Sequence, residues 1–131
     1  MKNKEALWKG VIYGQPITKK NSQRIVTNPR TKRYMIMPSK QYKDYEAAAS
    51  RSIEPPDAPI AKPVNVKCVY YMQTHRPCDL TNLMEATHDI LVKSNVLEDD
   101  NSKIINAVDG SRVDYDKENP RVEICIEEMY Q

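Results

Sequence analysis

The chain has little of several residues that mark common functional motifs. It contains no Phe, only three Gly and only three Cys, at positions 68, 78 and 125. No two cysteines form a CxxC pair, so the sequence predicts neither a zinc knuckle nor a disulfide framework, and reduced thiols are expected. It has no phosphate-binding P-loop and no GxGxxG dinucleotide fingerprint. These absences favour a function without a nucleotide cofactor or structural zinc.

Long apolar runs are absent as well. No stretch approaches the ~18 apolar residues of a membrane span. The N-terminal segment MKNKEALWKG lacks the apolar core of a signal peptide. We therefore expect a soluble cytoplasmic protein. A length of 131 residues fits one domain with a modest core, and we place the domain boundaries at residues 1 and 131.

Charge is nearly balanced overall but unevenly distributed. The formal net charge of +2 says little about a nucleic-acid partner. Residues 1–51, however, are rich in Lys and Arg and contain only three acids, Glu5, Asp44 and Glu46. Such an asymmetry suggests that one face binds a polyanion, although an unevenly charged solvated surface gives the same pattern.

Apolar periodicity and breaker residues predict both strands and helices. Ser39 is a suitable N-cap for an amphipathic helix that ends before Pro55 and Pro56. A second helix presents an apolar stripe and follows the central strand. The order predicts an α/β (α+β) domain with a mixed β-sheet and two main helices. Strands are expected at residues 7–13, 24–27, 33–37, 64–72, 104–113 and 122–126, and helices at 39–53 and 80–94.

Acidic residues gather between positions 76 and 103, which hold six of the 18 Asp and Glu. Asp79 comes just before the second helix, Glu85 lies in it, and Glu98, Asp99 and Asp100 follow it. Adjacent carboxylates repel one another unless a cation offsets their charge. A hard divalent cation bound by these oxygens would also activate water near neutral pH, as a nuclease requires. Other interpretations stay open: Asp79 as an N-cap, Glu85 as a solvent-facing residue, and the acidic run as a solvated loop.

A basic and polar segment precedes these acids. Lys19, Lys20 and Arg24 supply positive charge, and Asn21 and Ser22 supply hydrogen bonds of the kind that phosphates accept. An exposed polar loop is the alternative. The Asn82 amide is a further candidate for orienting a ligand or contacting phosphate. Asp89 is either a further metal ligand or a surface residue, and the sequence does not decide between them. His75 and His88 lack the spacing of a metal-ligand pair.

Three short blocks, in order, resemble one known family. The first is GQPITKKNSQR, residues 14–24, which is similar to a G-x-P-x-x-K-x-N-S segment. The second is DLTNLMEATHDIL, residues 79–91, which is similar to D-x-D-N-x-x-K-x-x-x-D-x-L. The third is EDDNSKI, residues 98–104, which is similar to D-D-x-x-I. Together they resemble the RusA family of Holliday-junction resolvases, which is found in phages and prophages.

The resemblance implies a small α/β homodimer that resolves branched DNA by paired symmetric nicks. Each subunit would use Mg²⁺, with Mn²⁺ as an alternative, to cut one of two opposed strands of a four-way junction. Carried over by position, Asp79 matches the family's first essential aspartate, and Asp99 and Asp100 match its later acidic pair. Asp100 aligns with the essential member of that pair. The host cytoplasm is the expected location for a phage-encoded or prophage-encoded protein.

Two positions depart from the family pattern. Thr81 stands where the pattern has a second aspartate, and Glu85 stands where it has a lysine. Our hypothesis is a compensated exchange in which Glu85 restores the missing carboxylate. The alternative is a non-catalytic protein of the same fold that binds DNA structures without cutting. The lost lysine leaves Lys20 or Lys103 to contact phosphate. The expected catalytic residues are Asp79, Glu85, Asp99 and Asp100; the metal ligands are Asp79, Glu85 and Asp100; the DNA-binding residues are Lys19, Lys20, Asn21, Ser22, Arg24 and Asn82.

Overall fold

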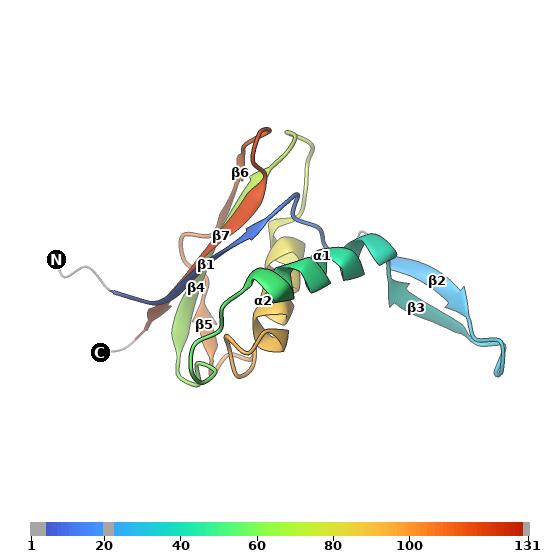
Figure 1. Ribbon diagram of the computed structural model, residues 1–131, viewed down its shortest axis with the longest axis horizontal. Helices are drawn as coiled ribbons and strands as arrows, with labels where there is room; N and C mark the ends of the chain where they lie inside the picture. The colour runs from blue at the N-terminus through green and yellow to red at the C-terminus, as the bar shows by residue number, and fades with distance from the viewer. Residues whose placement is uncertain (1–4, 20–22, 130–131) are drawn as a thin grey trace.

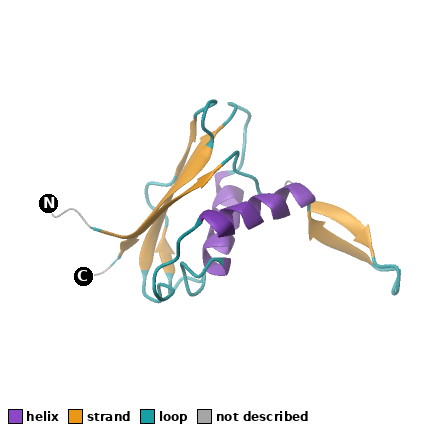
Figure 2. Cartoon of the chain, in the orientation of Figure 1, coloured by secondary structure: helices purple, strands orange, loops and turns teal. Residues whose placement is uncertain are grey.

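A computed structural model describes residues 5–19 and 23–129 of the chain. Two helices cover one face of a twisted sheet, and a separate hairpin extends from the body (Figures 1 and 2). The helices are α1 (Lys40–Ser52) and α2 (Leu80–Lys93). The strands are β1 (Ala6–Tyr13), β2 (Gln23–Thr27), β3 (Tyr34–Pro38), β4 (Val64–Met72), β5 (Ile105–Ala107), β6 (Arg112–Tyr115) and β7 (Arg121–Glu128).

Within the described residues, five strands form the main sheet, in the order β1-β7-β4, with β5 and β6 both pairing with β4. β7 is antiparallel to both of its neighbours, and Ile124 lies opposite Gly10 on one side and Cys68 on the other. β5 and β6 run parallel to β4. The sheet is therefore mixed, which confirms the predicted fold class.

The core lies between the sheet and the helices. Alternate residues of β4 are buried because they point toward the helices, while their neighbours face the other side of the sheet. Each fully buried valine contributes roughly 1.5 kcal/mol or more to the free energy of folding. The Tyr70 hydroxyl and Thr87 Oγ1 lie 2.7 Å apart and join β4 to α2. This contact helps to fix the position on the sheet of α2, which carries Glu85 and lies between Asp79 and the Asp99–Asp100 pair in the sequence.

Both predicted helix starts are confirmed. Ser39 caps α1, and its hydroxyl accepts a hydrogen bond from the Tyr42 amide at 3.1 Å. Asp79 caps α2. The three cysteines are free, as expected. None of the described helices is long and apolar enough to cross a membrane.

β2 and β3 form a hairpin, residues 23–38, which confirms the strands expected at residues 24–27 and 33–37 and the hairpin that the segment NPRTK between them predicts. Its strands pair with each other in a two-stranded sheet, with Arg24 opposite Met37 and Thr27 opposite Tyr34. It leaves the body at the N-terminal end of α1 and projects away from the main sheet (Figure 1). We call it the β2–β3 arm.

Candidate functional site

Asp79 sits at the N-terminus of α2, where unpaired backbone amides favour a negative charge. Its Oδ1 accepts a hydrogen bond from the Thr81 amide at 3.0 Å and another from Thr81 Oγ1 at 2.5 Å. Both residues are exposed. The N-cap interpretation of Asp79 is thus confirmed, and its carboxylate remains at the surface, where a metal ligand must also be.

Glu85 lies one helical turn beyond Thr81, and residues four apart occupy neighbouring positions on a helix surface. Its side chain is exposed, whereas Asn82 is half-buried. Glu85 therefore lies on the same side of α2 as Thr81, which is the arrangement that the compensated exchange requires.

Asp99 and Asp100 lie in the segment that follows α2. Leu97 holds this segment against the last turns of the helix through a 3.3 Å bond from its amide to the Leu91 carbonyl. The Asp99 carboxylate accepts hydrogen bonds from the Asp100 amide at 2.7 Å and from the Asn101 side chain at 3.0 Å. Asp99 and Asp100 are both exposed. These local bonds stabilise the acidic loop and orient Asp99 along the chain.

The two acidic groups lie toward opposite ends of α2. Asp79 precedes the helix, and Asp99 and Asp100 come after its C-terminal end, in the loop drawn in orange in Figure 1. A helix of 14 residues is about 21 Å long. Among residues 5–19 and 23–129, no group of three or more His, Cys, Asp or Glu is placed to hold a metal ion. The oxygen donors suit a hard cation such as Mg²⁺, but these side chains do not converge within one chain.

His88 couples the middle of α2 to the acidic loop. Its side chain is half-buried, and its Nε2 has no hydrogen-bond partner among the described residues. Burial lowers the pKa of His88 below its usual value, and the negative charge of Asp100 partly offsets that shift. Asp100 is therefore near enough to His88 to act on its charge. We expect the imidazole to be neutral at pH 7.

Lys19, a predicted phosphate contact, forms an ion pair with Asp89. Lys19 Nζ lies 2.7 Å from Asp89 Oδ2, and Lys93 Nζ lies 3.2 Å from the same oxygen. Lys93 also pairs with Glu46 of α1 at 3.2 Å. Burial alone would raise the pKa of Asp89, but the two ammonium groups outweigh it and hold the pKa below its usual value. The network joins the loop after β1 to both helices, so Lys19 has a structural role.

Four other residues predicted to contact DNA are Lys20, Asn21, Ser22 and Arg24. Lys20, Asn21 and Ser22 lie outside the described residues. Arg24 lies in β2, and its backbone pairs with Met37. The end of the β2–β3 arm carries three further exposed cations, Arg30, Lys32 and Arg33, which the sequence prediction did not include. The lack of any acidic residue around them was the signal that could have identified them.

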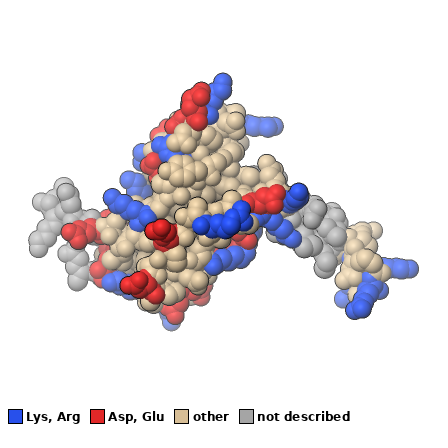
Figure 3. Space-filling model, in the orientation of Figure 1, with Lys and Arg blue, Asp and Glu red and all other residues tan. Residues whose placement is uncertain are grey.

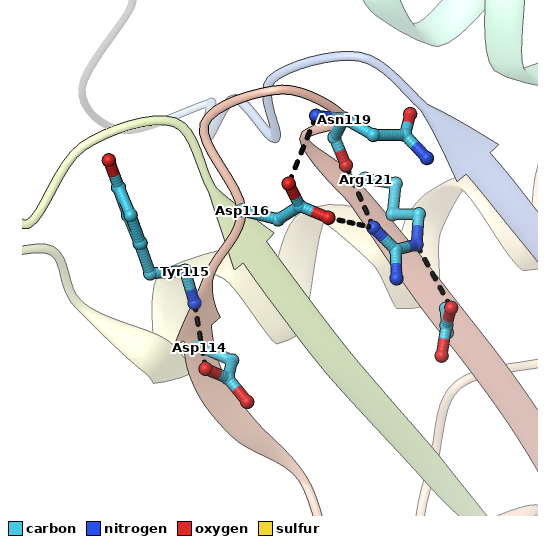
Figure 4. Close-up of polar contacts among 6 residues, drawn as sticks. Asp114, Tyr115, Asp116, Asn119 and Arg121 are labelled. Carbon is cyan, nitrogen blue, oxygen red and sulfur yellow. Dashed lines mark hydrogen bonds and ion pairs between the residues drawn. The ribbon is translucent and has the colours of Figure 1, made fainter.

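A second polar cluster lies at the end of the main sheet, where β6 leads into β7 (Figure 4). Arg121 donates to Asp116 and to Glu123, at 2.9 Å in each case, and its guanidinium lies 4.0 Å from the Tyr71 ring centre. Tyr115 points away from this cluster. Because two carboxylates pair with Arg121, this cluster offers little free positive charge to a polyanion.

The chain was compared with models of known protein families. The family model described as endodeoxyribonuclease RusA matches residues 14–127. The match includes the β2–β3 arm, both helices and the two acidic groups. No curated protein matches the chain.

Proposed function

Because the chain belongs to the RusA family of endodeoxyribonucleases, we propose that it is a Mg²⁺-dependent nuclease that cuts four-way DNA junctions by paired symmetric nicks. The observation that carries the proposal is the exposure of Asp79, just before α2, and of Asp100, after it. By the resemblance, both match acidic positions of the family. Exposed carboxylates flanking one helix can reach both a metal and a DNA backbone.

Asp79, Glu85 and Asp100 would hold the metal through their carboxylate oxygens. When bound, Mg²⁺ would lower the pKa of a coordinated water and stabilise negative charge on the phosphate. Asp99 orients the acidic loop through its bonds to Asp100 and Asn101. Mn²⁺ offers the same oxygen-directed chemistry.

We further propose that the working site needs two copies of the chain. Three carboxylates do not converge within the described residues of one chain, and Asp79 precedes α2 whereas Asp100 follows it. A twofold axis that sets two α2 helices antiparallel would bring Asp79 of one copy toward Asp100 of the other. Two such composite sites match the near-twofold symmetry of a four-way junction. A composite site of this kind would explain why the protein needs to form the homodimer expected from the family resemblance.

A non-catalytic DNA-structure-binding protein is the second candidate. One observation favours it: Thr81 replaces a carboxylate and donates its hydroxyl hydrogen to Asp79 Oδ1. A carboxylate that caps a helix and accepts a side-chain hydrogen bond has less charge to offer a metal. The two candidates differ in whether Glu85 restores what Thr81 lacks.

The deciding experiment incubates the protein with a synthetic four-way junction and Mg²⁺. The wild-type protein is compared with Asp100→Asn and with Asp57→Asn, which removes an exposed carboxylate far along the sequence from both acidic groups. We expect symmetric nicks from the wild-type protein and from Asp57→Asn, and none from Asp100→Asn. Tight junction binding without nicks from any of the three proteins would support the non-catalytic candidate and refute the nuclease.

A further inference from the structure

Positive charge is concentrated in one continuous part of the sequence. Residues 14–43 contain eight Lys or Arg and no Asp or Glu, whereas the other 101 residues contain 12 Lys or Arg and 18 Asp or Glu. A chain with a net charge of +2 therefore divides into a segment of +8 and a remainder of −6. The β2–β3 arm lies inside the positive segment. Such segregation is typical of a surface that binds a polyanion.

The end of the arm is a defined turn. Asn28 Oδ1 accepts hydrogen bonds from the Arg30 amide at 2.9 Å and the Thr31 amide at 3.4 Å. The Lys32 amide donates to the Asn28 carbonyl at 2.8 Å, and the Asn28 amide donates to the Arg33 carbonyl at 2.9 Å. These four bonds order the backbone that carries the cations. Binding a partner therefore costs less ordering entropy than it would for a loose loop.

The cations of this turn differ in their surroundings from Lys19 and Arg121, which form ion pairs. Arg30, Lys32 and Arg33 are exposed and gather at the far end of the arm (Figure 3). In the part of the chain that the structure describes, no carboxylate forms an ion pair with any of them, in contrast to Lys19 and Arg121. Tyr34, next to them, is 79% exposed. Three unpaired cations on a projecting turn, beside an amphipathic ring, form a surface suited to phosphates.

We propose that the β2–β3 arm grips the DNA backbone at a distance from the cleavage site, through Arg30, Lys32 and Arg33. The proposal rests on the proposed function, because it takes branched DNA as the ligand. A two-stranded ribbon is narrow enough to follow the major groove, which is about 12 Å wide. Contacts to phosphates position a protein on DNA without reading its sequence. The arm thus sets the orientation of a junction on the enzyme, while the acids of α2 act on the scissile strand.

The test measures binding of fluorescent junction and duplex DNA in EDTA, where no cutting occurs. The test variant is Arg30→Ala/Lys32→Ala/Arg33→Ala. The matched control, Arg51→Ala/Lys62→Ala/Lys117→Ala, removes the same charge from exposed positions outside the arm. For the test variant we expect dissociation constants about 10- to 100-fold higher at 0.1 M salt. The slope of log affinity against log salt should fall by about 3, as the loss of three phosphate contacts requires. The control should stay within about threefold of wild type.

Two further measurements separate contact from indirect effects. Arg30→Lys/Arg33→Lys retains the charges and should keep most of the affinity and salt slope. A photo-crosslinker attached at Thr31→Cys, with the accessible Cys78 and Cys125 replaced by Ser, should form covalent adducts with the DNA strands. Thermal unfolding should be unchanged for the alanine variant, because the turn lies outside the core.

The outcomes distinguish the arm from the nuclease. Wild-type nicking, together with unchanged affinity and salt slope in the arm variant, would overturn the arm proposal and leave the function intact. Absent nicking, with affinity that still depends on Arg30, Lys32 and Arg33, would overturn the nuclease and leave the arm as a DNA contact. A change in oligomeric state without a change in DNA affinity would show that the arm contacts a second copy of the chain, which also overturns the proposal.

Discussion

The hydroxyl of Thr81 donates a 2.5 Å hydrogen bond to Asp79 Oδ1, the oxygen that also caps α2. By the resemblance of its sequence block, Thr81 stands where the RusA family pattern has an aspartate. Two aspartates so close in sequence would repel each other and attract a cation. Threonine replaces that repulsion with a hydrogen bond, which stabilises the helix start without a metal.

This relationship makes Thr81→Asp an informative change. If Glu85 now supplies the missing carboxylate, Glu85→Gln alone should reduce junction cutting by about 10- to 100-fold or more, because losses of that size follow even from removing a metal's outer-shell partner. Thr81→Asp should then rescue Glu85→Gln in the double variant. Cutting rates against Mg²⁺ concentration measure both effects, and junction affinity in EDTA confirms that binding is retained.

Undiminished cutting by Glu85→Gln would refute the compensated exchange. Failure of Thr81→Asp to rescue the double variant would show that the lost function of Glu85 is not that of a second carboxylate.

Asp79 itself should be tested as Asp79→Asn rather than Asp79→Ala. Asn caps helices as well as Asp does, whereas Ala costs about 1 kcal/mol of folding free energy.

Mixing two inactive variants tests whether the site is shared between copies. Asp79→Asn and Asp100→Asn should each be inactive alone. In a mixed dimer, one composite site would lack both carboxylates and the other would keep both. At equal mixing about half of the dimers are mixed, so single nicks should return on a denaturing gel. If every site lies within one chain, the mixture stays inactive, and the composite site is refuted.

Most of the fold could be predicted because its signals are local. The alternation of apolar residues set the strand at residues 64–72, which β4 matches, and Ser39 marked the start of α1. The position of β7 between β1 and β4 could not be predicted, because it depends on pairing between strands far apart in the sequence. The split of residues 104–113 into β5 and part of β6 likewise depends on where β4 offers hydrogen bonds.

The candidate site was less predictable, for a related reason. The family resemblance pointed to Asp79 and Asp100, but only the structure shows that no three such side chains are placed to hold a metal within the described residues of one chain. Lys19 and Asp89 are 70 residues apart in the sequence, and nothing local predicts their ion pair. The sequence left Asp89 open between a ligand and a surface residue. Its contacts give it a third role, which is to hold the loop after β1 against both helices.

The ion pairs of Asp89 should make part of the stability acid-sensitive. Because Lys19 and Lys93 hold the pKa of Asp89 below its unfolded value of about 3.9, their contribution is present above that pH and is lost as pH falls through the folded pKa. Asp89→Asn should lower the free energy of unfolding by about 1 kcal/mol at pH 7. Urea unfolding from pH 7 to pH 3 should show this difference shrinking toward the acid end. A constant difference across that range would contradict the assignment.

The half-buried imidazole of His88 gives a second prediction about how stability depends on pH. Burial lowers the pKa of His88, so below about pH 6.5 the unfolded chain binds a proton that the folded chain does not. The free energy of unfolding should therefore fall as pH drops below 6.5, and His88→Gln should remove that slope. His75→Gln, the control, should retain it.

Asp100→Asn removes a negative charge that raises the pKa of His88, so the imidazole should titrate at lower pH. NMR of the histidine ring protons in EDTA measures this directly, and an unchanged titration in Asp100→Asn would show that the acidic loop does not lie beside His88 in solution.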